Sequence, residues 1–257
     1  TPLIAKIFPA AAENVPDFHA AGGVPAVMKE ILPLLHKEAL NVNGKTVAQN
    51  VADAKIMNSR MIKTLAQPWA AEGGLAVLRG NLAPNSCITK PAAIRPEIHK
   101  FTGKAHCFDS EEAANQAILD CKVVEGEVVV IRYEGPKGGP GMREMYMAMK
   151  LLFGQGLALK TALVTDGRFS GTNNGCFVGH ISPEAAEGGP LAVVRDGDLI
   201  TIDIPARKLH LQVSDEEIKA RLTKWKRPEP KFKKGYLALY SRLAESADKG
   251  AIIRNKF

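Results

Sequence analysis

The chain has 257 residues, of which 46% are hydrophobic, and it carries a formal net charge of +7. This length predicts one large domain or two small ones, with enough interior for a core that needs no disulfides. The composition excludes disordered, collagen-like and coiled-coil proteins, and no apolar run approaches the roughly 20 residues of a membrane-spanning helix. We therefore expect a globular protein with no membrane partner and, from the pattern of its first residues, no secretory signal.

Positive charge is concentrated at the C-terminal end. Residues 219–257 contain 12 Lys and Arg against 3 Asp and Glu, whereas the rest of the chain is close to neutral. Such a segment can bind nucleic acid or another anionic surface. Because Lys231, Lys233 and Lys234 are not set in a recognisable nucleic-acid-binding motif, we expect no nucleic-acid partner. We interpret the segment as solvated or as docked on an acidic neighbour, and we expect that neighbour to be the missing half of the protein or a second subunit rather than nucleic acid.

Four cysteines, Cys87, Cys107, Cys121 and Cys176, are widely spaced and form no C-x-x-C pair. This spacing argues against a zinc site and predicts free thiols in a reducing, cytoplasmic compartment. Cys176 lies in a loop rich in glycine and asparagine, and we interpret it as a small buried hydrophobic residue.

In chain order, residues 4–61 are predicted to be helical with intervening loops. Apolar residues recur at helical spacing between Val24 and His36, which predicts a helix there. The stretch is too short to fold alone. We therefore interpret residues 1–66 as the end of an α/β domain and expect a second domain over residues 67–257.

From residue 67 onward the pattern changes to short strands separated by turns. The expected strands are Leu75–Arg79, Glu127–Tyr133, Thr161–Thr165, Phe177–Ile181, Leu191–Arg195, Leu199–Ile204 and Leu209–Val213. Asp196-Gly197 predicts a hairpin between the strands on either side of it. The predicted fold class is mixed α/β, a strand-rich β-barrel or compact sheet with helices at its rim.

Three helices are expected among these strands. The first has Asp109 as its N-cap and ends near Cys121, and another is opened by the capping box at Ser214 and ends near Lys224. The remaining helix is expected over residues 144–153. A fourth, short helix is predicted to begin at Ser182 as its N-cap.

A glycine-rich loop, residues 133–144, connects a predicted strand to a predicted helix. Backbone amides in such a loop can hold an anion such as phosphate or carboxylate, but the Walker and dinucleotide-binding spacings are missing. Glu144, at its end, is either an ordinary acid in the first helical turn or an oxygen ligand for Mg²⁺.

The segment after the Thr161–Thr165 strand contains Ser170 between an aromatic residue and a glycine. Its hydroxyl can act as a base only if a metal or Arg168 lowers the serine pKa. Alternatively, Ser170 and Thr172 hydrogen-bond their own turn. His180, at the end of the next strand, can orient a substrate oxygen or be structural.

Four segments resemble the dihydroxy-acid dehydratase / phosphogluconate dehydratase family: residues 72–84, 130–144, 165–171 and 178–186. The match extends from about residue 20 to residue 251. It implies a hydro-lyase that removes water from a 2,3-dihydroxy carboxylic acid to give a 2-oxo acid. The substrate is either a branched-chain dihydroxy acid of amino-acid biosynthesis or a sugar acid, such as 6-phosphogluconate or an aldonate.

The resemblance also implies roles for individual residues. Ser170 takes the C2 proton as an alkoxide with Thr172 in support, Glu144 ligates Mg²⁺, and Arg168 and His180 are candidates for substrate binding. An iron–sulfur cluster acts as Lewis acid on the leaving hydroxyl. None of the family's cluster motifs is present here, so the cluster is expected on an N-terminal part that this chain lacks.

Family members are about twice this length, with a C-terminal β-barrel "swivel" domain and an N-terminal domain that carries the cluster. Because the chain also begins with Thr1 rather than methionine, we expect a fragment or processed product that is inactive alone. A homodimer or homotetramer is expected. A different interpretation is a binding module that kept the barrel and lost catalysis.

Overall fold

The computed structural model describes residues 1–8, 10–170 and 175–254, so Thr172 lies outside the described residues. The chain divides into two compact units, Thr1–Gly74 and Leu75–Phe257. In the described part of the chain we find no helix with both the length and the apolarity needed to cross a membrane.

The first unit contains three short helices, α1 (Val15–Ala20), α2 (Gly23–Glu30) and α3 (Val47–Asn50), around a small buried cluster that includes Ala26 and Ile62. The predicted Val24–His36 helix is wrong in its extent. The observed helix α2 ends at Glu30 and is followed by a 3₁₀ turn over Leu32–Leu34. Pro33 explains the change, because proline disfavours the α conformation of the residue before it.

The second unit is a closed barrel of eight strands, in the order β1-β2-β6-β5-β4-β3-β7-β8. The strands are β1 (Ala76–Gly80), β2 (Ala83–Thr89), β3 (Lys100–Phe108), β4 (Glu127–Ile131), β5 (Ala162–Thr165), β6 (Cys176–Ser182), β7 (Leu199–Asp203) and β8 (Lys208–Leu211). Neighbours from β3 through β4 and β5 to β6 are parallel. The predicted mixed α/β class is confirmed, and of the two architectures the barrel is the one present.

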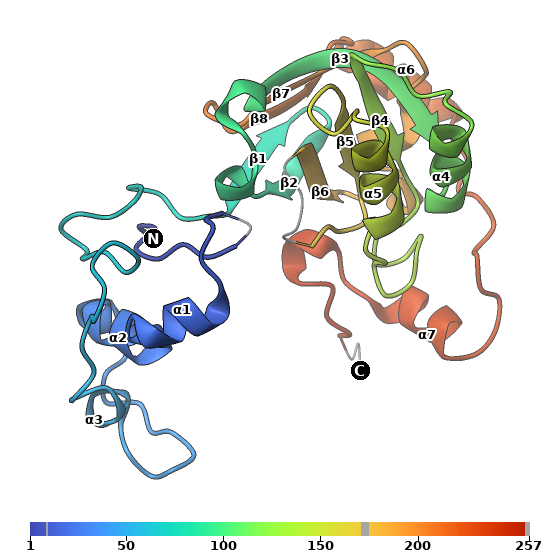
Figure 1. The fold of residues 1–257 in the computed structure, drawn as a ribbon. Coiled ribbons are helices and arrows are strands. Elements are labelled where there is room, and N and C mark those ends of the chain that lie inside the picture. Colours follow the sequence, from blue (N-terminus) through green and yellow to red (C-terminus); the bar gives the residue numbers. More distant parts are fainter. Residues whose placement is uncertain (9, 171–174, 255–257) are drawn as a thin grey trace. The chain divides into compact units, whose positions relative to one another are not determined.

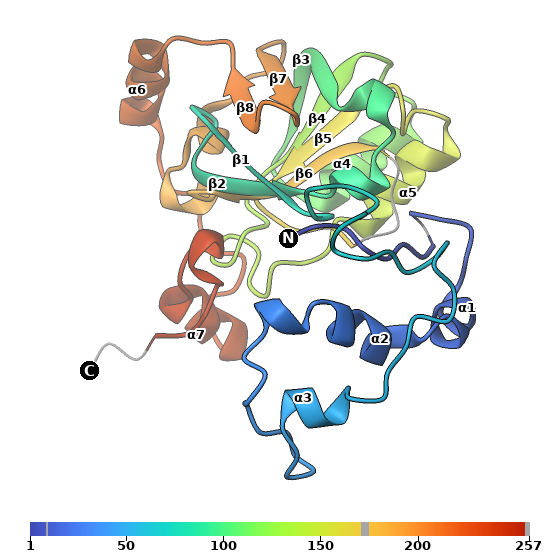
Figure 2. The same ribbon diagram turned by 90° about the vertical axis from the view of Figure 1, so that its left-hand side faces the viewer.

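Helices α4 (Glu111–Leu119) and α5 (Tyr146–Gly154) lie side by side against the outside of the barrel (Figures 1 and 2). Val129 and Leu163 pack outward into the apolar cluster beneath these helices, whereas Val130 and Val164 belong to the barrel interior. Strands buried on both faces read as continuous hydrophobic runs, which is why β4 and β5 were predicted from sequence.

Two further helices follow the last strand. Helix α6 (Asp215–Lys224) begins where predicted, with the Glu217 amide donating to the Ser214 hydroxyl at 3.2 Å. Helix α7 (Tyr236–Leu243) lies in the basic C-terminal segment and was not predicted.

Two local predictions are wrong. Leu191–Arg195 is not a strand: Pro190 opens a 3₁₀ turn over Pro190–Val193, and the hairpin joins β7 to β8 instead. The N-cap of α4 is Ser110, whose hydroxyl accepts from the Ala113 amide at 3.1 Å. Asp109 does not cap the helix, and its carboxylate binds the Arg132 guanidinium at 2.5 Å.

Candidate active site

The candidate site lies where the parallel strands β4 and β5 end. The carboxyl ends of parallel strands meet at one edge of a sheet, which is where α/β proteins commonly place their sites. The glycine-rich loop, residues 133–144, comes after β4, and the segment 166–170, called the serine loop below, follows β5. Both loops therefore emerge at the same edge of the barrel.

Backbone contacts join these loops to each other and to β6. Glu144 and Arg168 form an isolated parallel bridge, and the Met145 amide donates to the Arg168 carbonyl at 2.8 Å. The His180 amide donates to the Gly167 carbonyl at 2.8 Å. The structure thus brings the segments of Glu144, Arg168, Ser170 and His180 together, while their chemical roles stay predictions.

The Arg168 side chain is exposed, and its Nε donates to the Met142 carbonyl at 2.6 Å. Glu144 is half-buried. The arginine is therefore fastened to the glycine-rich loop.

His180 lies at a β-bulge in β6, with a positive φ of 56°. The register between β2 and β6 shifts between Ser86 and Ile88. Val178 belongs to the barrel core, and the next core residue of β6 is Ile181, three positions on. An extra residue in a strand changes which side chains face inward, and bulges often re-aim a side chain beside a site. The bulge thus excludes His180 from the core.

The predicted helix that begins at Ser182 is wrong. Strand β6 continues through this buried residue, and the Ser182 hydroxyl bonds to the Ser246 hydroxyl at 2.6 Å and the Asp248 carboxylate at 2.5 Å. The next helical turn is a 3₁₀ turn over Ala185–Glu187. Ser182 therefore anchors the C-terminal segment to the barrel.

Ser170 and His180 share a small hollow of about 40 Å³. Its other lining residues are Ile88, Thr89, Lys90, Phe169, Phe177 and Gly179. By size it holds a few waters or one small polar group rather than a whole sugar acid.

Burial lowers the pKa of His180 below its ordinary value of 6.5, and the charges of Arg168 and Lys90 lower it further. The imidazole is therefore expected to be neutral at pH 7. An NMR titration of histidine-labelled protein checks this, with a midpoint below 6.5 expected for His180. A midpoint at or above that value would contradict the burial of the ring beside these two cations.

Asp166 is completely buried and ties the two loops together. Its carboxylate accepts from the amides of Glu134 at 2.8 Å, Ala185 at 2.9 Å and Tyr133 at 3.2 Å. Burial raises the pKa of Asp166 to about 6 despite these three donors. Asp166 is thus a backbone-organising group of the site rather than a solvent-exposed acid.

Glu184 occupies the amides of the glycine-rich loop. Its carboxylate accepts from the Lys137 amide at 3.0 Å and from the Gly138 amide at 2.8 Å, and burial raises the pKa of Glu184 to about 7. The sequence predicted that this loop can hold an anion. The anion found there is a carboxylate of the chain itself.

Glu134 connects the same loop to the basic C-terminal segment. It is fully buried, and its Oε1 forms an ion pair with Lys231 Nζ at 2.8 Å and accepts a hydrogen bond from Arg143 Nη2 at 3.1 Å. Arg227 pairs with Glu187 in the same region. Lys231 and Arg227 of the basic segment therefore pair with acids of the barrel unit itself, while docking on a missing half or a second subunit stays a prediction.

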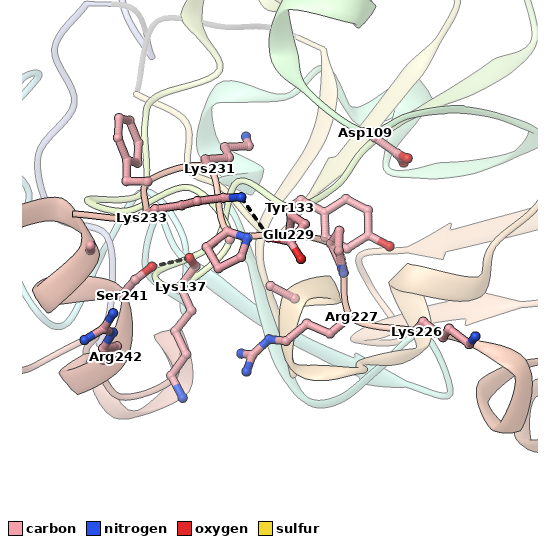
Figure 3. A pocket seen from close by; sticks show the side chains of 16 residues that line it. Asp109, Tyr133, Lys137, Lys226, Arg227, Glu229, Lys231, Lys233, Ser241 and Arg242 are labelled. Carbon is pink, nitrogen blue, oxygen red and sulfur yellow. Dashed lines mark hydrogen bonds and ion pairs between the residues drawn. The ribbon is translucent and has the colours of Figure 1, made fainter.

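A cavity of about 820 Å³ lies between the glycine-rich loop and residues 226–242 of the C-terminal segment (Figure 3). Ser241 on α7 donates to the Lys137 carbonyl across it at 2.6 Å. Its lining does not include Glu144, Arg168, Ser170 or His180. We therefore place the candidate chemistry in the small hollow and not in this cavity.

Comparison with known proteins places these loops in a family. Residues 60–251 match the model described as dihydroxy-acid/6-phosphogluconate dehydratase C-terminal, and residues 1–50 match the corresponding N-terminal model. The chain belongs to the dihydroxy-acid/6-phosphogluconate dehydratase family.

Relatives named dihydroxy-acid dehydratase match nearly the whole chain. The proteins of Caldanaerobacter subterraneus subsp. tengcongensis and Acetivibrio thermocellus are 52% and 51% identical, over 98% and 99% of this chain. That of Aquifex aeolicus is 49% identical over 98% of it. In each case the match covers 46% of the relative, so the chain spans about half the length of these relatives.

The described residues do not provide a complete set of ligands for the iron–sulfur cluster and the Mg²⁺ that membership of this dehydratase family implies. Burial raises the pKa of the Cys87, Cys107 and Cys176 thiols to about 12, which disfavours the thiolates that bind iron. Within the residues that the structure describes, no three His, Cys, Asp or Glu side chains gather as a metal site would require. Glu144 alone does not make a magnesium site.

Sequence reasoning missed four residues of this candidate site and its surroundings: Lys90, Glu134, Asp166 and Glu184. The three acids lie inside the family motifs, but their function depends on amides that are distant in sequence. Lys90 follows β2, a strand that was not predicted. No local signal marks any of the four.

Proposed function

We propose that the chain is part of a hydro-lyase that dehydrates a 2,3-dihydroxy carboxylic acid to a 2-oxo acid. The observation that carries this proposal is identity of about 50% with proteins named dihydroxy-acid dehydratase over nearly the whole chain. The arrangement of the site supports it, since the segments of Glu144, Ser170 and His180 meet at one barrel edge.

In the proposed reaction the C2–H bond breaks, its proton passes to the Ser170 oxygen, and the C3 hydroxyl leaves. The hydroxide that leaves C3 takes up the proton held by Ser170, so one water is lost and the alkoxide is restored. The resulting enol loses its O–H proton and gains one at C3, which gives the 2-oxo acid. A serine hydroxyl removes such a proton only as an alkoxide. Nearby positive charge favours that ionised form.

We further propose that the iron–sulfur cluster and Mg²⁺ implied by the family are held mainly by ligands outside this chain, with Glu144 as its contribution. The lack of a complete ligand set among the described residues is the reason. On this proposal, residues 1–257 alone do not dehydrate the substrate. A cytoplasmic location is proposed from the four free thiols.

Substrate preference is tested with the complete gene product, purified anaerobically and assayed for 2-oxo acid formation. We expect kcat/KM for branched-chain 2,3-dihydroxy acids to exceed that for aldonates and 6-phosphogluconate by at least about 100-fold. A preference for a sugar acid would contradict the assignment of substrate class. No dehydration of either class would contradict the proposed function.

A further inference from the structure

One charged side chain of the small hollow has no part in the function proposed above. Lys90 directly follows β2, and Thr89, the last residue of that strand, donates its hydroxyl to the Phe177 carbonyl at 2.8 Å. This buried bond fastens the end of β2 to β6. This bond therefore holds the backbone of Lys90 in a fixed position beside the hollow.

The Lys90 side chain is half-buried, and among the described residues its ammonium has no hydrogen bond or ion pair. The residues that line the hollow include no Asp or Glu. A half-buried lysine beside a hollow without acidic residues can serve there as the counter-charge of an anion. The hollow thus offers a place for negative charge.

Ser170 is the group in this hollow that the proposed reaction makes anionic. Besides Lys90, the charged or titratable described residues beside this hollow are His180, which is expected to be neutral at pH 7, and Arg168, whose charge acts on His180. Arg168 is exposed and directs its Nε to the Met142 carbonyl. Lys90 is therefore better placed than Arg168 to act on Ser170, because it lines the same hollow.

We propose that Lys90 is a positioning residue whose ammonium stabilises the Ser170 alkoxide that takes the C2 proton. Lys90 itself gains and loses no proton. The inference rests on the proposed function, and it replaces Arg168, the candidate cation of the sequence analysis, with the residue that directly follows β2.

The test uses the complete gene product with Lys90→Met, Lys90→Arg and, as a matched control, Lys104→Met, an exposed lysine of β3. We expect Lys90→Met to lower kcat by about 100-fold to 1,000-fold with KM changed by less than about threefold. The acidic limb of the pH–kcat profile should move to higher pH by about one unit. Lys90→Arg should have a kcat within about tenfold of the wild-type value. The control Lys104→Met should have the same kcat and pH profile as the wild type.

The outcomes separate the two proposals. If Ser170→Ala is inactive while Lys90→Met keeps wild-type kcat and pH profile, the inference about Lys90 is overturned and the proposed function stands. The inference about Lys90 is also overturned if Lys90→Met lowers kcat without moving the acidic limb of the pH–kcat profile and Lys90→Arg restores no activity. That result would show a structural role for Lys90. If Ser170→Ala retains full activity, the base assignment itself fails.

Discussion

Replacement of Ser170 by alanine should lower kcat for dehydration by at least about 1,000-fold, because it removes the proposed proton acceptor. Ser170 lies half-buried on the serine loop, whose backbone is fixed by bonds that do not involve its hydroxyl, such as His180 N to Gly167 O. We therefore expect the variant to fold normally. The measurement is single-turnover and steady-state 2-oxo acid formation by the complete gene product.

The control for that experiment is Ser214→Ala. Ser214 caps α6 and is exposed, so its loss should cost about 1 kcal/mol of stability without affecting the reaction. Iron and magnesium contents of both variants should equal those of the wild type. Dehydration by Ser170→Ala at more than about a tenth of the wild-type rate would refute the role of this serine.

Removal of the buried carboxylate by Asp166→Ala should destabilise the fold strongly. Two buried amides, of Glu134 and Ala185, and the half-buried amide of Tyr133 would lose their acceptor, at about 1–3 kcal/mol for each buried one left unsatisfied. Loss of the buried charge offsets part of this above pH 6. We expect a net loss of about 2–5 kcal/mol in the free energy of unfolding, measured by urea denaturation.

The pH dependence of that loss has a definite sign. The pKa of Asp166 is about 6 in the folded protein against an ordinary 3.8, so its contribution to stability is full below pH 3.8 and falls as pH rises through 6. Asp166→Ala should therefore cost more at pH 5 than at pH 8, by roughly 1–2 kcal/mol. Asp120→Ala, at an exposed carboxylate, is the control. An equal loss at both pH values would contradict the raised pKa.

Strands with continuous hydrophobic runs, such as β4 and β5, were predictable, whereas β2 and β3 were not. Strand β2 contains Pro84 and Asn85, residues that locally favour turns, and its pairing with β1 and β6 overrides that preference. Strand β3 has a glycine at its centre. A Cβ on Gly103 would lie 2.2 Å from the Gly126 carbonyl oxygen, so the glycine is required by a contact that no local pattern reveals.

The candidate site was predictable only where family motifs mark it. Glu144, Arg168, Ser170 and His180 lie in such motifs, and the structure brings their segments together. The hollow itself was not foreseen, because Lys90 enters it through the pairing of β2 with β6. Periodicity identifies faces of strands, but it does not identify which side chain a bulge turns away from the core.

The contact between Glu184 and the glycine-rich loop has a consequence for anions that approach this loop. Loops of this kind bind phosphate through free backbone amides, yet here the Lys137 and Gly138 amides are engaged by a carboxylate of the chain. A phosphorylated sugar acid would have to displace Glu184 to place its phosphate there. The intramolecular carboxyl group thus acts as a competitor, built into the loop, of any external anion that would bind these two amides.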